Sequence, residues 1–155
     1  MKKLIILFVL PLFFLSCSKD DSSKTYTVMV NIEDEYGLAY PSMVRLYDYN
    51  EAMPAVQKHI NDNNAYKYGT DRKLYDTNGA EISPVYTSAN MVGVNTFEEV
   101  KAGKYLIVVL YKPSGYSFEN FWFYGYKGID VNKDNELGMY KCKFPNTSRG
   151  KFYNF

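Results

Sequence analysis

The chain has 155 residues, and its 18 Lys and Arg nearly balance its 17 Asp and Glu. A nearly neutral charge without a basic block argues against nucleic acid as a partner and against a charged patch for anionic membranes. With one histidine and two cysteines, the sequence has too few ligands for a zinc site, so we expect no metal and no cofactor.

The first predicted element is an export signal. Met1-Lys2-Lys3 precedes an apolar run, residues 4–15, that is too short to span about 30 Å of hydrocarbon at about 1.5 Å per residue. Phe14-Leu15-Ser16-Cys17 resembles a bacterial lipobox, in which the cysteine is lipidated and becomes the first mature residue. We therefore predict a signal peptide over 1–16 and a lipid on Cys17 that attaches the protein to a membrane. The alternative is an ordinary signal peptide with a chance cysteine.

Residues 17–25 are polar and have nothing to bury, which predicts a disordered tether. Ser18-Lys19-Asp20-Asp21 resembles the surface-export signal of outer-membrane lipoproteins in some Gram-negative anaerobes. The alternative is a solvated linker. On the first interpretation the protein is anchored in the outer membrane and faces the cell surface.

The next two elements are strands with one apolar face each. Residues 26–33 alternate, and their apolar face consists of Tyr26, Val28, Val30 and Ile32. After an acidic turn with Gly37, residues 43–49 form a second strand. Its inward side chains are Val44 and Leu46, and its outward ones are Arg45 and Tyr47.

A short helix and a hairpin are predicted next. Ala52, Val56 and Ile60 recur every four residues, which predicts a helical insertion near residues 51–60 with Asn50 as its cap. Asn78-Gly79 then separates two short strand-like runs. This dipeptide favours a type I′ turn, in which both residues have positive φ.

Two strand-like runs, 92–97 and 105–111, flank a link that contains Gly103. Seven successive apolar or aromatic residues in the second run require cover on both faces. We predict this hairpin as the centre of a two-layer fold, with Gly103 at a positive-φ corner. The helical insertion is the expected cover for Leu106, Val108 and Leu110.

Residues 118–126 are strongly aromatic. Alternation means that one set of rings faces the core: either Trp122, Tyr124 and Tyr126, or Phe121 and Phe123. The other set faces the insertion, a partner or solvent. Tryptophan and tyrosine rings stack on sugars and anchor protein partners, so Trp122, Tyr124 and Tyr126 are the candidate ligand-binding residues. The alternative is that these rings fill the core.

The last predicted strand spans 137–144 and turns Tyr140, Cys142 and Phe144 inward. Cys142 on that face is expected to be a buried, inert thiol rather than a nucleophile. Regular short strands separated by turns indicate an all-β protein, an antiparallel β-sandwich of about seven strands in a single domain over 26–155.

The order of motifs resembles transthyretin-like (carboxypeptidase-regulatory-like) domains. The matching segments are Val28–Asp34, Gly37, Val44-Arg45-Leu46-Tyr47, and a "Phe-x-x-Val-x-x-Gly-x-Tyr" corner at Phe97, Val100, Gly103 and Tyr105. The resemblance implies a transthyretin- or immunoglobulin-like sandwich. Because that family is functionally diverse, the resemblance implies no particular activity.

Catalysis finds little support in the sequence. His59 has no partner motif and is expected at the surface, and Glu98-Glu99 is expected in a solvated corner. Asp130–Glu136 resembles the start of a calcium loop, but Asn135 replaces the turn glycine and Lys141 the final glutamate. We therefore expect no enzyme, but a non-catalytic domain that binds a surface glycan or a protein. The alternative is a structural or assembly component, such as a part of a fimbrillin-like adhesin.

Overall fold

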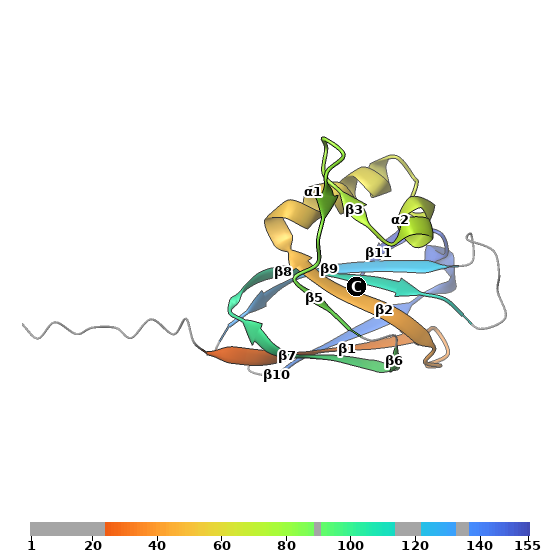
Figure 1. Ribbon diagram of the computed structural model, residues 1–155. Coiled ribbons are helices and arrows are strands. Elements are labelled where there is room, and N and C mark those ends of the chain that lie inside the picture. Colours follow the sequence, from red (N-terminus) through yellow and green to blue (C-terminus); the bar gives the residue numbers. More distant parts are fainter. Residues whose placement is uncertain (1–23, 89–90, 114–121, 133–136) are drawn as a thin grey trace, which may run out of the picture.

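The computed structural model describes residues 24–88, 91–113, 122–132 and 137–155. Two sheets face each other (Figure 1). The three-stranded sheet has the order β10–β1–β7, with β1 at Thr25–Asp34, β7 at Val94–Lys101 and β10 at Leu137–Phe144. The signal peptide, Cys17 and all of the tether up to residue 23 lie outside the described residues.

The larger sheet has the order β11–β9–β8–β2–β5, and β6 (Met91–Val92) also pairs with β2. Its other strands are β2 (Pro41–Asp48), β5 (Tyr86–Thr87), β8 (Gly103–Tyr111), β9 (Phe123–Val131) and β11 (Phe152–Asn154). The predicted β-sandwich is therefore confirmed. Most strand pairs are antiparallel as expected, whereas β1–β10 and β9–β11 are parallel.

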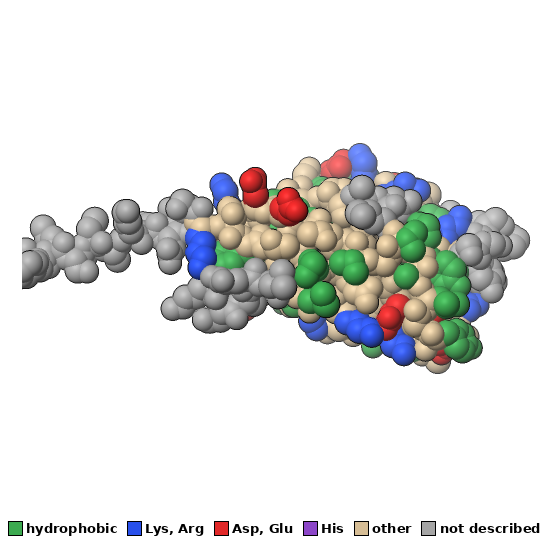
Figure 2. All heavy atoms as spheres, turned by 90° about the horizontal axis from the view of Figure 1, so that it is seen from below, with side chains coloured by type: hydrophobic (Ala, Val, Ile, Leu, Met, Phe, Trp, Pro, Cys, Tyr) green, Lys and Arg blue, Asp and Glu red, His purple; other side chains and the backbone are tan. Residues whose placement is uncertain are grey.

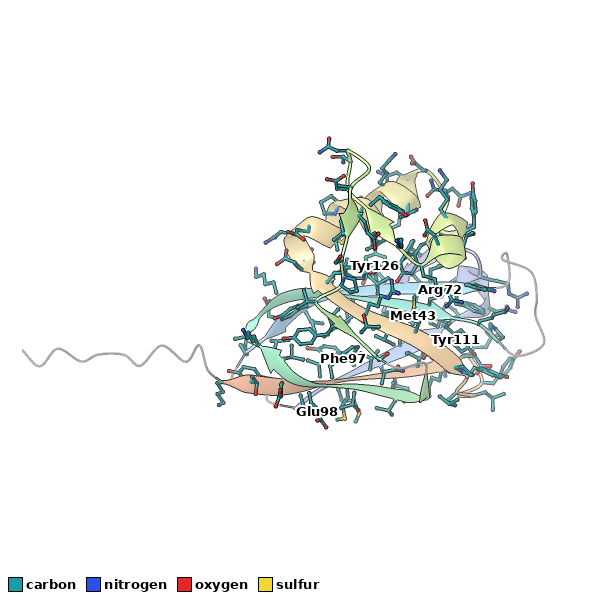
Figure 3. The ribbon with its side chains drawn as sticks, in the orientation of Figure 1. Met43, Arg72, Phe97, Glu98, Tyr111 and Tyr126 are labelled. Atoms are coloured by element: carbon teal, nitrogen blue, oxygen red, sulfur yellow. The ribbon has the colours of Figure 1, made fainter. Side chains whose placement is uncertain are left out.

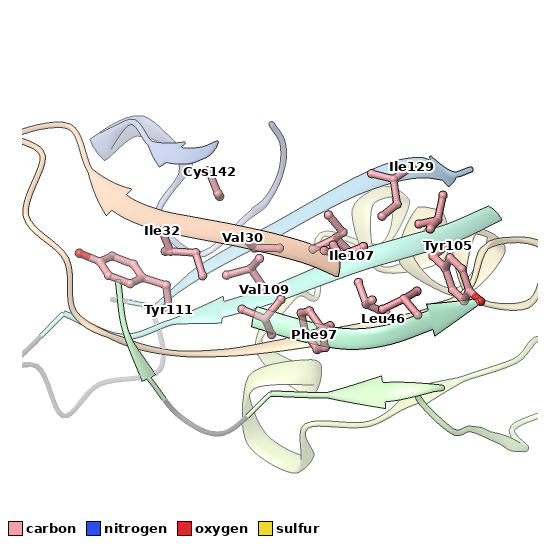
Figure 4. Close-up of a cluster of buried hydrophobic side chains, with 14 of the residues drawn as sticks. Val30, Ile32, Leu46, Phe97, Tyr105, Ile107, Val109, Tyr111, Ile129 and Cys142 are labelled. Carbon is pink, nitrogen blue, oxygen red and sulfur yellow. The ribbon is translucent and has the colours of Figure 1, made fainter. Parts of the chain in front are cut away.

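The core between the sheets follows the predicted alternation. The four apolar residues of β1 are all buried, and they meet Val44 and Leu46 of β2. The inward row of β8 runs along the same core, with Tyr105 and Tyr111 at its two ends (Figure 4). Cys142 of β10 is buried in this cluster, as predicted.

The predicted central hairpin is wrong. β7 pairs with β1 in the three-stranded sheet, whereas β8 lies in the other sheet between β2 and β9. The chain thus crosses from one sheet to the other at Ala102. The prediction that Gly103 has a positive φ is also wrong. The residue with a positive φ near this crossing is Glu99 (φ 56°).

A bulge explains why Glu99 has this conformation. Val28 pairs with Phe97 and Tyr26 with Val100, so β7 contains one more residue than β1 over this stretch. Residues three apart on a regular strand point to opposite faces. The bulge turns both Phe97 and Val100 into the core, where they are 4% and 0% exposed.

A helical layer covers the outer face of the larger sheet (Figure 1). It comprises α1 (Tyr49–Asn61), α2 (Tyr66–Asp71) and a hairpin of β3 (Leu74–Tyr75) and β4 (Glu81–Ile82). Its buried residues pack on Leu106, Val108 and Leu110, which confirms the predicted cover. The insertion is longer than predicted, and α2 was not foreseen.

Two local predictions in this layer need correction. The cap of α1 is Asp48 rather than Asn50, and its carboxylate accepts hydrogen bonds from the backbone N–H groups of Asn50 and Glu51. In the β3–β4 hairpin only Gly79 of the Asn-Gly pair has positive φ. The Asp76 carboxylate accepts from two backbone N–H groups, those of Asn78 and Ala80, and so fixes a turn other than type I′.

The outer face of the three-stranded sheet has no such layer over its described residues. Both apolar and charged side chains are exposed on this side of the molecule (Figure 2). Met139 is 62% exposed there, and Lys141 forms an ion pair with Glu33 at 2.7 Å. Among the described residues, no helix is long and apolar enough to cross a membrane.

Candidate ligand-binding site

The aromatic run divides between the two faces of β9. Phe123 points into the sandwich core, whereas Trp122, Tyr124 and Tyr126 belong to the cluster beneath the helical layer. Figure 3 shows Tyr126 below the helices. Tyr124 is completely buried, and the other two side chains are half-buried. Phe121 lies outside the described residues.

Close packing explains the burial of Tyr124. Its ring centroid lies 5.6 Å from that of Phe152, which also contacts the rings of Tyr126 and Tyr68. A Cβ at Gly69 of α2 would come within 2.4 Å of the Tyr124 hydroxyl and 3.2 Å of the indole of Trp122. Glycine is therefore required for this approach of α2 to β9. Tyr124 has a packing role and offers no free ring face to a ligand.

We expect Trp122→Ala to lower the free energy of unfolding by about 1–3 kcal/mol, because the half-buried indole packs against Gly69 and Lys112 lies over its ring. Urea denaturation measures the loss. Tyr66→Ala, on the exposed side of the same layer, is the control and should change stability by less than about 0.5 kcal/mol. An unchanged stability of Trp122→Ala would favour a binding role for Trp122.

A hollow of about 220 Å³ opens at the end of the sandwich where β1 and β8 finish. Its aromatic and apolar lining consists of Tyr36, Leu38, Tyr40, Tyr111, Pro113, Phe123 and Phe144. Its polar lining consists of Asp34, Glu35, Asn146 and Arg149. We call this hollow the sandwich-end pocket.

Tyr111, the last residue of β8, is a buried ring that lines the pocket from the core side. Its centroid lies 5.5 Å from those of Phe123 and Phe144, and 5.6 Å from that of Tyr40. The Phe144 ring is nearly parallel to it, at 12°. These contacts fix the ring in one orientation and give the pocket a rigid apolar floor.

The Tyr111 hydroxyl is buried and has no hydrogen-bond partner among the described residues. Burial raises the pKa of this phenol further above neutral pH, so the hydroxyl keeps its proton and can only be a hydrogen-bond donor or a neutral acceptor. A buried donor without a partner costs about 1–3 kcal/mol. A ligand that accepts this hydrogen bond would recover part of that cost.

The charged groups form the rim. Asp34 accepts hydrogen bonds through Oδ1 from the backbone N–H groups of Tyr36 and Leu38, at 2.9 and 2.8 Å, which fixes the loop. The Arg149 guanidinium lies 5.8 Å from the Phe123 ring centroid and donates to Asn146 Oδ1. The pocket therefore presents donors and acceptors around an aromatic floor.

The other residues that the sequence singled out do not form a catalytic group. His59 is half-buried, and its ring forms a hydrogen bond with Asn64. The side chains of Glu98 and Glu99 are exposed. Burial raises the pKa of the Cys142 thiol. Within the described ranges, no group of three or more His, Cys, Asp or Glu is placed to hold a metal. The calcium-like loop lies partly outside the described residues.

No protein-family model matches the chain, and no curated protein matches its sequence. BcpA, the major pilin subunit of Bacillus cereus, is similar in structure, with 13% sequence identity and a TM-score of 0.41. The match covers 78% of this chain and 29% of the pilin, so the chain spans less than a third of that protein. What the geometry defines is a β-sandwich with a helical layer and a pocket at one end.

Proposed function

We propose that the protein is a lipid-anchored, non-catalytic binding domain of the outer membrane, exposed at the cell surface, and that its sandwich-end pocket binds a glycan. The observation that supports this proposal is the buried hydroxyl of Tyr111 in an aromatic pocket, which has no hydrogen-bond partner in the described part of the chain. The same proposal includes a transthyretin-like identity for the domain and a lipid attached to Cys17.

The chemistry of the pocket suits a sugar. One face of a sugar ring is apolar and stacks on aromatic side chains, while its hydroxyls both donate and accept hydrogen bonds. The pocket offers the exposed ring of Tyr36 and the half-buried ring of Tyr40 for stacking, above the buried rings of its floor. Its polar groups are the Tyr111 hydroxyl, the carboxylates of Asp34 and Glu35, and the Arg149 guanidinium. Its volume of about 220 Å³ is below the usual ~300–1,000 Å³ of drug-sized sites, which favours one sugar unit over a long segment.

The position of the pocket supports a role at the cell surface. The tether would enter the domain at Thr25, the first residue of β1, whereas Asp34, the last residue of that strand, lines the pocket. Ten residues of strand span about 33 Å. A domain attached at Cys17 would thus hold the pocket at the end remote from the anchor.

The assembly alternative would need a free sheet edge for a second subunit. The edge of β7 carries the Glu99 bulge, and the Tyr86 hydroxyl accepts a hydrogen bond from the backbone N–H of Lys101 at 3.2 Å. At the β10 edge of the same three-stranded sheet, Lys141 and Lys143 are exposed. Bulges and lysines hinder strand addition. We therefore favour ligand binding over a fimbrillin-like assembly role.

Tyr111→Phe tests the proposal because it removes only the hydroxyl and keeps the packing of the ring. We expect unchanged or slightly increased thermal stability, since a buried polar group is lost. Affinity for a bound oligosaccharide should fall about 2- to 10-fold, the value of one hydrogen bond. Calorimetric titration with neutral oligosaccharides of glucose, mannose and xylose measures the affinity.

Tyr49→Phe is the matched control, because Tyr49 lies at the start of α1, away from the pocket. It should bind like the native protein. Equal affinities of Tyr111→Phe and the control would contradict the proposed site. Failure of every oligosaccharide to bind would contradict the glycan proposal and favour a protein partner.

A further inference from the structure

The tip of the β3–β4 hairpin carries the one Asn-Gly pair of the chain, Asn78-Gly79. Both residues are exposed, and a Cβ added at Gly79 would meet no atom within 4 Å. An asparagine followed by glycine is the arrangement in which the side-chain amide is lost most easily, because no side chain shields the backbone nitrogen of the glycine. The pair is therefore a candidate for chemical modification as well as a turn.

The reaction of such a pair needs only water. The backbone nitrogen of Gly79 loses its proton and attacks Cγ of Asn78, the bond from Cγ to the side-chain nitrogen breaks, and ammonia leaves. The product is a five-membered succinimide ring. Water opens this ring at either of its carbonyl carbons, which gives aspartate or isoaspartate at position 78. The freedom of the Gly79 nitrogen to reach Cγ therefore controls the rate.

In the folded hairpin this nitrogen is not free. The backbone N–H of Gly79 donates to the carbonyl oxygen of Asp76 at 3.1 Å, and the N–H of Asp76 donates to the carbonyl oxygen of Ala80 at 2.9 Å. Oδ1 of Asp76 accepts from the N–H groups of Asn78 and Ala80, each at 2.8 Å. All four hydrogen bonds involve Asp76, and we call them together the Asp76 clamp. The attack on Cγ requires the clamp to open.

The hairpin is short enough for the clamp to open without unfolding of the domain. β3 and β4 have two residues each and form a sheet of their own. A two-stranded hairpin is marginally stable by itself. The hairpin is fixed to the helical layer by the buried side chains of Leu74 and Ile82, whereas the residues of the tip are exposed or half-buried. Local opening of the tip can therefore release Gly79 while Leu74 and Ile82 stay packed.

We propose that Asn78 is a site of spontaneous deamidation and that the Asp76 clamp sets its rate. Aspartate at position 78 places a second negative charge near Asp76. Isoaspartate adds one methylene group to the backbone, so the N–H groups of residues 78 and 80 no longer fit the same carboxylate oxygen. The isoaspartate form therefore has an open hairpin tip. This reaction requires no ligand and is independent of the glycan proposed for the sandwich-end pocket.

The test is the rate at which Asn78 is converted in the purified protein, kept in mildly alkaline buffer with and without urea. Mass spectrometry of the tryptic peptide 74–101 locates and measures the change. Asn78 should be converted at least about tenfold faster in the unfolded protein than in the native one, because the clamp is absent there. Asp76→Ala should react about three- to tenfold faster than the native protein in buffer, and at the same rate as the native protein in urea.

Asp76→Asn is the matched control, because its amide oxygen can accept the same two hydrogen bonds. It should react within about twofold of the native protein in buffer. If Asp76→Ala proves unfolded by circular dichroism, Asp76→Asn decides: a folded Asp76→Asn protein that reacts as fast as the urea-unfolded chain would overturn the clamp. Equal rates for native and unfolded protein would overturn it as well, as would a folded Asp76→Ala protein that reacts at the native rate. Absence of conversion at Asn78 in urea would overturn the site itself.

Discussion

Leu106→Ala should lower the free energy of unfolding by about 2–5 kcal/mol, measured by urea denaturation. Leu106 is completely buried on the face of β8 that the helical layer covers, among Ala52, Ala55 and Val56 of α1. Truncation removes buried apolar contacts and leaves a cavity that the rigid sheet fills poorly. Ile107→Ala, on the opposite face of the same strand, should cause a loss of similar size.

The control on this strand is Lys104→Ala, because Lys104 is exposed. It should change stability by less than about 0.5 kcal/mol. A Leu106→Ala protein as stable as this control would show that the helical layer does not pack on the sheet in solution. A large loss for Ile107→Ala alone would lead to the same conclusion.

Cys17→Ser should transfer the protein from the membrane fraction to the soluble fraction of the cell. The proposal makes the lipid on Cys17 the anchor, and burial of acyl chains, at about 0.8 kcal/mol per CH₂, is the force that holds it. Labelling with radioactive palmitate should be lost at the same time. Fractionation and autoradiography of the same samples measure both effects.

Ser18→Ala is the matched control and should remain labelled and membrane-bound. Persistent labelling of the Cys17→Ser variant would refute the lipobox interpretation. The orientation has its own test, in which protease added to intact cells should digest the native protein. Full protection from that protease would indicate the periplasmic side and contradict exposure at the cell surface.

The alternation of apolar and polar residues along the chain predicted the strands well. The inward residues of β1 and β10 and the two-sided burial of β8 follow from side-chain periodicity alone, which is a property of a few consecutive residues. The assignment of β7 and β8 to different sheets does not follow from it. A short link with a glycine suits a hairpin as well as a crossing, and the bulge at Glu99 depends on the pairing of β7 with β1.

The candidate pocket was harder to foresee. The sequence drew attention to Trp122, Tyr124 and Tyr126 because they lie together in the chain, and the fold turns them towards the helices. The sandwich-end pocket instead combines residues from the ends of β1, β8 and β10 and the start of β9. The topology of the sheets brings these residues together. In the sequence alone, Tyr111 cannot be distinguished from the core residues of the same strand.

The parallel pairing of β1 with β10 has a consequence for the order of folding. Thr27 pairs with Leu137 and Asp34 with Phe144. The first strand, β1, therefore gains this partner only when β10, near the end of the chain, is available. Contacts between such distant segments form slowly, because a long loop must close before they stabilise the chain. The three-stranded sheet is therefore incomplete until residue 144 is free to join it. If the proposed signal peptide directs export, this delay would keep the chain from completing its fold before it has crossed the membrane.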